Sequence, residues 1–197
     1  GVPVIEDVAE APGARYKGTM LGSIGAMSCY SFFGNKIITT GEGGIVLTDD
    51  SGLRDRLEVL RDHGMSKERR YHHTHVGFNY RMPNLNAALG CAQLEQLPDF
   101  LTSKRDLFQR YKQAFLEIPE VEIFQEPKGC KSNYWLQTMK LSEPIAKDRD
   151  AILEATNDVG LMTRPVWKLL HTLIPYRLQE NGMESGKVKL VILMMVG

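Results

Sequence analysis

The sequence predicts an α/β fold that gives way to a smaller α+β portion towards the C-terminus. A short strand is expected at residues 2–5, and two further apolar runs, at residues 26–33 and 45–48, have the length of buried strands. Helical periodicity follows the third run and returns over residues 83–115. After about residue 118 the expected order becomes strand, strand, helix, strand, which is typical of α+β folds. A chain of 197 residues can hold one substantial domain and part of another.

The first helix is bounded by residues that favour helix ends. The segment Asp49–Ser51 supplies N-cap residues, and Gly64 is expected to terminate the helix. Between them, Leu53, Leu57 and Leu60 recur at helical spacing.

A second helix is expected to begin at Pro83 and to be interrupted at Pro98. Small and apolar residues mark the face that we expect to be buried: Leu85, Ala88, Leu89 and Ala92. The helix that follows carries an aromatic stripe, which predicts core packing rather than a cofactor contact: Phe100, Leu107, Phe108, Tyr111 and Phe115.

The last part of the chain is expected to contain strands at residues 121–124, 134–139 and 161–166, with a helix at 148–158 before the third strand. The apolar run at 190–196 fits a buried strand, and as an exposed segment it would favour aggregation.

The composition excludes several function classes. Basic and acidic residues are equal at 24 each, so net charge does not favour nucleic acid or an acidic membrane as a partner. The three cysteines (Cys29, Cys91 and Cys130) are widely spaced, which predicts buried thiols rather than disulfides or a zinc site. We expect no membrane span, no signal peptide and a cytoplasmic location.

A polar loop at residues 65–76 contains His72, His73 and His75. Three histidines in four residues can hold a metal, but no cysteine or second cluster accompanies them. We therefore expect a solvated loop and no metal site.

The loop between the second and third strands contains one lysine, Lys36, and several glycines. Glycine lets the backbone approach a ligand closely. A lysine that is desolvated between two strands loses its charge more readily and can attack a carbonyl. On composition alone the commoner alternative is a solvated surface lysine.

Two neighbours favour the chemical interpretation of Lys36. Asp7 is expected at the carboxyl end of the first strand, where ligands collect in open α/β sheets. A carboxylate there can pair with a protonated ring nitrogen, and the Ser31 hydroxyl can hold a phosphate. A pyridinium partner, a phosphate anchor and an imine-forming lysine are what pyridoxal phosphate requires of a protein.

Several separate segments resemble the DegT/DnrJ-type sugar aminotransferases. They occur in order over roughly residues 2–170, which is more specific than any one glycine pattern. The segments are Glu6–Ala11, Gly22–Gly25, Ser31–Lys36, Gly41–Gly44, Arg61–Gly64, Gly77–Met82 and Ala87–Gly90.

This resemblance implies a fold type I, aspartate-aminotransferase-like architecture. It also implies pyridoxal-phosphate-dependent transfer of an amino group, from a donor such as glutamate, to a nucleotide-linked keto sugar in polysaccharide biosynthesis. Residues 1–98 would be the C-terminal half of the cofactor-binding large domain. Residues 99–118 would be a linking helix, and residues 119–197 a small C-terminal domain with an atypical tail. Because the resemblance begins in the middle of the family's sequence, we expect a C-terminal portion of such an enzyme.

The resemblance also implies roles for individual residues. Lys36 would hold the cofactor and move a proton, and Asp7 would keep the ring nitrogen protonated. Ser31 would anchor the phosphate, while Asn79 would reach the phosphate of the other subunit in a homodimer. Glu10 stands where the family usually has Gln or His, beside the ring hydroxyl, and its carboxylate would tend to repel a phenolate oxygen.

Some alternatives stay open. Arg81 has either a phosphate or nucleotide contact or only a helix-capping role. Related sugar dehydratases have a histidine at the position of Lys36, so the lysine favours transamination. The second hypothesis is a catalytically incomplete remnant that acts only as a folded or interaction module, with an unpaired sheet edge that would favour association.

Overall fold

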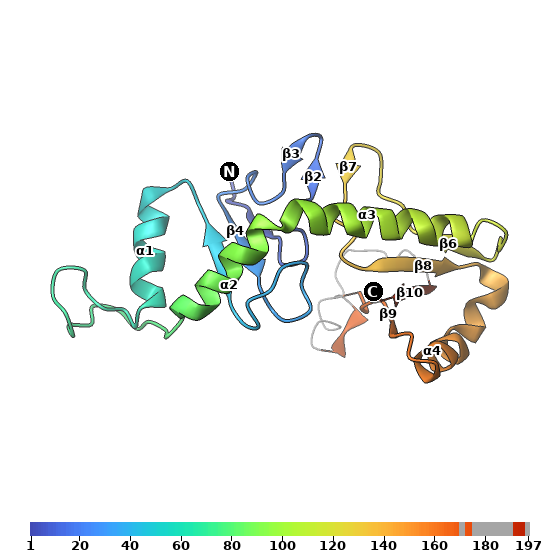
Figure 1. The fold of residues 1–197 in the computed structure, drawn as a ribbon. Helices are drawn as coiled ribbons and strands as arrows, with labels where there is room; N and C mark the ends of the chain where they lie inside the picture. Colours follow the sequence, from blue (N-terminus) through green and yellow to red (C-terminus); the bar gives the residue numbers. More distant parts are fainter. Residues whose placement is uncertain (170–171, 175–190, 196–197) are drawn as a thin grey trace. The chain divides into compact units, whose positions relative to one another are not determined.

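The computed structural model describes residues 1–169, 172–174 and 191–195, and the chain divides into two compact units (Figure 1). The first unit comprises Gly1–Lys104 and Glu126–Trp135. The second comprises Arg105–Gln125 and Leu136–Gly197. The division falls within the long helix α3 (Leu97–Ala114).

The first unit is built on a three-stranded sheet in the order β1 (Ile5–Asp7), β4 (Met27–Ser31), β5 (Gly44–Leu47). β1 runs parallel to β4, and β5 runs antiparallel to it. The three strands predicted for this part of the chain are therefore present. The first begins later than expected, at Ile5, because Pro3 has no N–H to donate to a neighbouring strand.

The expectation that the runs at 26–33 and 45–48 are both buried strands is wrong for the second run, which forms β5. Ser28 in β4 is fully buried, but Ile45, Val46 and Leu47 of β5 are exposed. A strand is buried only where a second layer covers it. The described elements of this chain leave the side chains of β5 open to solvent.

A small second sheet lies in the same unit. It has the order β3 (Thr19–Met20), β2 (Arg15–Tyr16), β7 (Cys130–Lys131). The turn between β2 and β3 has positive φ at Lys17 (47°) and Gly18 (84°), as a two-residue hairpin requires. The pairing of β2 with β7 brings the segment Glu126–Trp135 onto the first unit.

Helix α1 (Ser51–Arg61) begins and ends at the predicted signals. The Asp50 side chain accepts a hydrogen bond from the Leu53 N–H at 2.8 Å. Gly64 has φ +68°, and its N–H donates to the Val59 carbonyl at 2.9 Å. The N-cap and the glycine stop are both confirmed.

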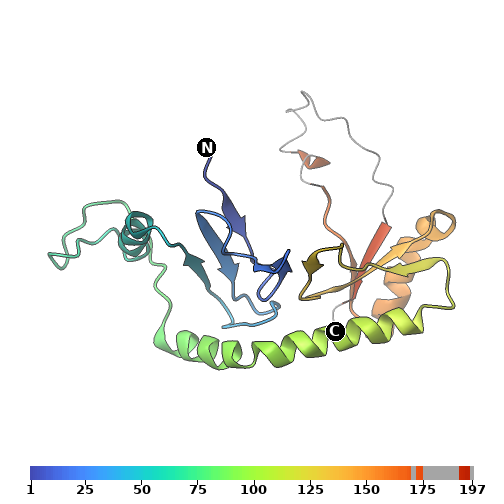
Figure 2. The ribbon, with the colours of Figure 1, turned by 90° about the horizontal axis from the view of Figure 1, so that it is seen from above.

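Helix α2 (Asn84–Glu95) leads into α3 with a break at Gln96, which Figure 2 shows as a change in the course of the helix. The start at Pro83 is confirmed. The predicted buried face is wrong, because Leu85, Ala88, Leu89 and Ala92 are all exposed.

The opposite side of α2 faces the loop that follows β4. Asn86 Nδ2 donates to the Thr40 carbonyl at 2.7 Å, and Gln93 Oε1 accepts from the Thr39 N–H at 3.2 Å. Gly90 lies between them, and a Cβ at this position would be 3.0 Å from the Thr40 Cγ2 atom. Loop backbone needs hydrogen-bond partners, so amides rather than apolar side chains occupy this face.

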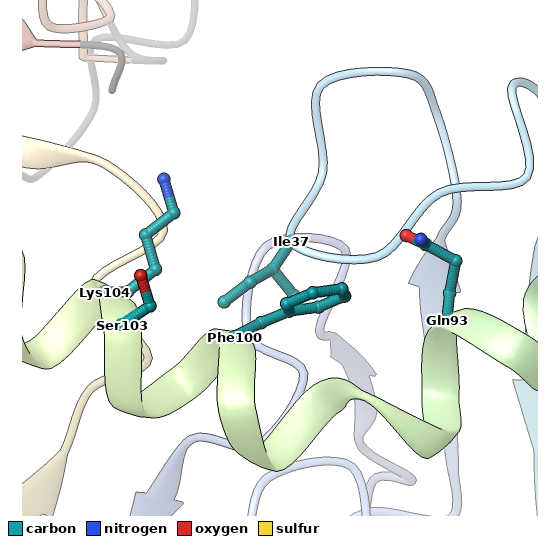
Figure 3. Close-up of a pocket in the computed structure, with 5 residues that line it drawn as sticks. All are labelled: Ile37, Gln93, Phe100, Ser103 and Lys104. Atoms are coloured by element: carbon teal, nitrogen blue, oxygen red, sulfur yellow. The ribbon is translucent and has the colours of Figure 1, made fainter.

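A small pocket of about 220 Å³ lies where this loop meets the start of α3, and Figure 3 shows the Ile37 side chain beside the Phe100 ring. Gln93, Ser103 and Lys104 complete its lining. Burial lowers the pKa of the Lys104 ammonium from its usual value. The Phe100 end of the predicted aromatic stripe thus packs against the residue that follows Lys36.

The second unit contains a four-stranded antiparallel sheet in the order β6 (Val121–Ile123), β8 (Gln137–Leu141), β10 (Val191–Met195), β9 (Thr163–Pro165). The 3₁₀ helix η1 (Glu143–Asp148) and helix α4 (Arg149–Asp158) follow β8. Phe108 of α3 is buried with 2% of its surface exposed, and Ile123, Met139 and Leu141 are buried in the same unit.

Most elements predicted for this part are confirmed. The apolar tail does form a strand, β10, which pairs with both β8 and β9. The strand expected at 134–139 begins at Gln137 instead, because Asn133, Tyr134 and Trp135 are part of the first unit. Within the described ranges, no helix is both long enough and apolar enough to cross a membrane.

Candidate functional site

The sheet brings Asp7 and Ser31 to the same edge. Asp7 is the last residue of β1 and pairs with Cys29 of the parallel strand β4, whose last residue is Ser31. The carboxyl ends of parallel strands meet at one edge of a sheet, and ligands of open α/β sheets bind there. Asp7 is exposed, and its Oδ1 accepts from the Ala9 N–H at 3.1 Å. Ser31 is half-buried, and its Oγ accepts from the Phe33 N–H at 3.3 Å.

Lys36 lies in the loop that leaves this edge after β4. Its Nζ atom donates to Glu10 Oε1 at 2.7 Å and lies 4.5 Å from the centroid of the Trp135 ring. Only 11% of the Lys36 side chain is exposed, against 50% for Glu10. The alternative of a solvated surface lysine is therefore wrong for this structure. Glu10 follows β1 and Lys36 follows β4, so their ion pair joins the two loops.

Sequence reasoning missed the third component of this site, which is the segment Glu126–Trp135. Asn133 and Trp135 are buried, with 5% and 9% of their surfaces exposed. Asn133 Nδ2 donates to the Glu10 carbonyl, and Trp135 Nε1 donates to the Asn35 carbonyl. The available signal was Asn133 directly before an expected strand, since asparagine is depleted in strands.

Glu6 fixes the loop that precedes β4 against β1. Its carboxylate accepts from the N–H groups of Gly22 (2.7 Å), Ile24 (2.7 Å) and Gly25 (2.6 Å). These bonds, led by that of Gly25, hold the pKa of the Glu6 carboxyl below its usual value. Burial, with a smaller effect of the Glu6 charge, raises the pKa of the nearby Tyr30 hydroxyl, which donates to the Leu21 carbonyl at 2.9 Å. The residue before Asp7 is thereby held in place.

The backbone contact that the structure describes for Asn79 is with the loop after α1. Asn79 is exposed, and its backbone forms a bridge with Asp62 in the loop after α1. Arg81 lies nearby and pairs with Asp62 at 3.3 Å, which is a contact at the end of α1. On either side of Asn79, the rings of Phe78 and Tyr80 stack with their centroids 5.0 Å apart.

The three histidines of the 65–76 loop are exposed. His73 Nδ1 lies 2.9 Å from the His63 carbonyl oxygen, and His75 Nδ1 lies 2.9 Å from the Thr74 hydroxyl. In the part of the chain that the structure describes, no three His, Cys, Asp or Glu side chains are grouped closely enough to hold a metal ion.

The family model of the DegT/DnrJ/EryC1/StrS aminotransferases matches residues 1–189. The chain belongs to this family. The predicted resemblance to the DegT/DnrJ-type enzymes is therefore confirmed, and it covers slightly more of the chain than expected.

Two curated relatives in this aminotransferase family are GDP-perosamine synthases. The chain is 40% identical to that of Caulobacter vibrioides over 179 residues, which cover 88% of the chain and 47% of the relative. It is 42% identical to that of Escherichia coli O157:H7 over 173 residues, covering 88% of the chain and 46% of the relative. The chain thus spans about half the length of the curated relatives it matches.

The fold agrees with that of solved sugar aminotransferases. The structure of the aminotransferase TlmJ from Streptoalloteichus hindustanus matches with a TM-score of 0.86 and 27% identity, over 100% of this chain and 53% of TlmJ. The predicted fold class of the family, that of fold type I transferases, is confirmed at this level. The match covers both units of the chain.

The side chains at the sheet edge fit pyridoxal phosphate, the cofactor of this aminotransferase family. The group needs an amine, an acid for its ring nitrogen and donors for its phosphate. Lys36 supplies a nearly buried amine, Asp7 an accessible carboxylate and Ser31 a hydroxyl. A Cβ at Gly34, between Ser31 and Lys36, would meet no atom closer than the Gly41 carbonyl oxygen at 3.9 Å, so the backbone there is open to a ligand.

Proposed function

We propose that this chain carries the lysine side of a pyridoxal-phosphate-dependent aminotransferase site that acts on a nucleotide-linked keto sugar. The observation that carries the proposal is the Lys36 amine, 11% exposed, in the loop that leaves the edge where Asp7 and Ser31 end their strands. The sugar-nucleotide substrate is supported by the relatives, which are GDP-perosamine synthases. We propose the same domain division as the sequence indicates, with cofactor binding in residues 1–98.

Each residue has a proposed task. When bound, pyridoxal phosphate supplies an electron sink for the amino-group transfer. Lys36 binds it through its amine and, once released, carries a proton to and from the substrate carbon as base and acid. Asp7 keeps the ring nitrogen protonated by placing a negative charge beside it. Ser31 donates its hydroxyl to the phosphate.

The proposed task of Glu10 includes a direct contact with the Lys36 amine. Its carboxylate holds the Lys36 amine at 2.7 Å, and half of its own surface is exposed. Glu10 therefore contacts the reactive amine directly. Its proposed position beside the ring hydroxyl is the one that the resemblance to the family implies.

The proposal includes assembly of two subunits into a homodimer. Asn79 is exposed and its backbone pairs with Asp62, which suits a residue that reaches the phosphate bound by the other subunit of a homodimer. Glutamate is the proposed amino donor. The exposed β5 face favours the second candidate, an incomplete remnant that needs a partner, and the experiment below separates the two.

The test is titration of the chain with pyridoxal phosphate, followed by absorbance. We expect a yellow band from cofactor bound to the wild-type chain, and a mass increase at Lys36 after borohydride reduction. Lys36→Ala should lose both signals, because the variant has no amine at this position. Lys17→Ala is the matched control, since Lys17 also lies over an aromatic ring, that of Tyr16 at 5.2 Å.

The outcomes are distinct. A band that survives Lys36→Ala but is lost in Lys17→Ala would contradict the assignment of Lys36. If the wild-type chain is folded by circular dichroism and shows no band, the remnant interpretation holds instead.

A further inference from the structure

The segment Glu126–Trp135 connects the two loops that carry Glu10 and Lys36. It lies in the first unit although it is far from both loops in the sequence. Two of its buried side chains, Asn133 and Trp135, each make contacts with one of the loops.

Asn133 holds the loop of Glu10. Its Nδ2 donates to the carbonyl oxygens of Glu10 (2.8 Å) and Pro12 (3.1 Å). Its Oδ1 accepts from the Trp135 N–H at 3.0 Å. One amide therefore ties the backbone of the Glu10 loop to the backbone of Trp135, and a buried amide that is satisfied at both ends keeps one orientation.

Trp135 holds the loop of Lys36 in two ways. Its Nε1 donates to the carbonyl oxygen of Asn35, the residue before Lys36, at 2.6 Å. Its ring lies 4.5 Å from the Lys36 Nζ atom, within the range of a cation–π contact. The tryptophan thus restrains both the backbone and the amine of the lysine.

We propose that Asn133 and Trp135 are positioning residues that hold the Lys36 amine against Glu10 at the sheet edge. This inference deepens the proposed function, on which its meaning for catalysis rests. The geometry goes beyond general core packing, because two side chains of one short segment, two residues apart, contact the two residues of a single ion pair. Loss of either contact should leave the fold in place and release the amine.

Chemical labelling of the full chain tests the position of Lys36 without any cofactor. The probe is acetic anhydride, and the readout is the acetylated fraction of each lysine peptide by mass spectrometry. Trp135→Phe keeps a ring but removes the N–H donor, and Asn133→Asp keeps the shape but replaces both donor hydrogens with an acceptor. We expect acetylation of Lys36 to rise about threefold or more in each variant, as loss of one hydrogen bond predicts, with the other lysines unchanged.

Trp167→Phe is the matched control. Trp167 also has a cation over its ring, Arg164 at 5.2 Å, and lies in the second unit. It should leave Lys36 labelling at the wild-type value. Equal labelling of Lys36 in wild type, Trp135→Phe and Asn133→Asp, with unchanged circular dichroism, would overturn the proposal.

A second measurement covers the case in which a variant does not fold. The chain has two tryptophans, so Trp167→Phe leaves Trp135 as the one emitter of indole fluorescence. In that background we expect Lys36→Met to change the Trp135 emission, while Lys17→Met does not. If Lys36→Met leaves the Trp135 emission spectrum unchanged, the cation–π contact is contradicted.

Uptake of pyridoxal phosphate connects this inference with the proposed function. We expect Trp135→Phe to slow formation of the absorbance band about threefold, while the band keeps its wavelength. If the wild-type chain forms no band, the proposed function fails, and labelling still decides whether Asn133 and Trp135 position Lys36. If the band forms and labelling does not change, the positioning role fails alone.

Discussion

At the scale of single residues, Glu6 shows how the site edge is held in place. Three backbone N–H groups donate to its carboxylate, and all of them belong to the loop that leads into β4. Since Glu6 immediately precedes Asp7, this clamp fixes the strand end that carries the proposed ring-nitrogen partner. Charged acceptors make stronger hydrogen bonds than neutral ones, so the clamp depends on the charge of Glu6.

The lowered pKa of Glu6 predicts how stability depends on pH. Because the folded protein holds the carboxyl below its usual value of 4.5, the stabilisation is fully present above that value. It is lost as the pH falls through the lower folded value. We expect Glu6→Gln to reduce the free energy of unfolding at neutral pH and to flatten its decline in acid. Denaturant unfolding at a series of pH values measures both effects.

The control for this measurement is Glu95→Gln. Glu95 is exposed at the end of α2, and its side chain has no hydrogen bond in the described structure. It should keep the wild-type slope of stability against pH. A Glu6→Gln profile parallel to that of wild type would contradict the clamp.

The same residues show what a sequence can and cannot predict about a site. Lys36, Asp7 and Ser31 were singled out as candidate site residues because strand ends and loops are local features of the sequence. Trp135 was not, because its indole meets Asn35 across 100 positions of sequence, and no local pattern encodes such a contact. The Glu10–Lys36 ion pair was also missed, since the resemblance placed Glu10 against a cofactor rather than against the amine itself.

At the scale of elements, glycines at chain crossings fix the course of the loop between α1 and α2, which Figure 1 shows projecting beyond α1. Gly64 has φ +68°, and a Cβ there would collide with the His75 carbonyl oxygen. Gly77 lies at the same crossing, where a Cβ would collide with the Gly64 nitrogen. At the base of the loop that carries Asn79, the backbone at Gly64 thus lies in direct contact with the backbone at His75 and Gly77.

Gly64→Ala should therefore destabilise the protein more than a positive φ alone requires. The matched control is Gly160→Ala, where φ is +81° and a Cβ meets no atom within 4 Å. We expect roughly 1 kcal/mol from the backbone conformation in both variants, and a further loss in Gly64→Ala from the collision. Thermal or denaturant unfolding of the two variants gives the difference. Equal losses of unfolding free energy in the two variants would show that the loop accommodates the added methyl group without destabilisation.

Element faces were predicted less well than element positions. Asp50, Gly64 and Pro83 marked helix ends correctly, because capping depends on neighbouring backbone groups. The buried face of α2 was assigned to its leucines and alanines, yet Asn86, Gly90 and Gln93 face the loop of Thr39 and Thr40. A hydrophobic pattern indicates which face of a helix is apolar. It does not indicate whether that face is buried within the same chain or against another chain.

At the scale of the whole molecule, apolar surface remains open on the first unit. Exposed residues include Ile45, Val46 and Leu47 of β5 and Leu85 of α2, whose exposed fraction is 86%. Apolar area of this kind marks sites of association in proteins. The apolar composition of β5 and α2 also explains why the sequence analysis predicts these segments to be buried.

This surface predicts that the chain associates with a second copy, as the proposed homodimer requires. Leu85→Glu places a charge on the exposed face of α2, where burial of an unpaired carboxylate opposes association. Sedimentation velocity over a range of concentrations should show the wild-type chain shifting to larger species and Leu85→Glu shifting less. Leu116→Glu is the matched control, because Leu116 is also exposed, at 61%, and lies in the second unit. A wild-type chain that sediments as a monomer throughout would reject the homodimer, and an equal effect of both variants would reject α2 as its contact surface.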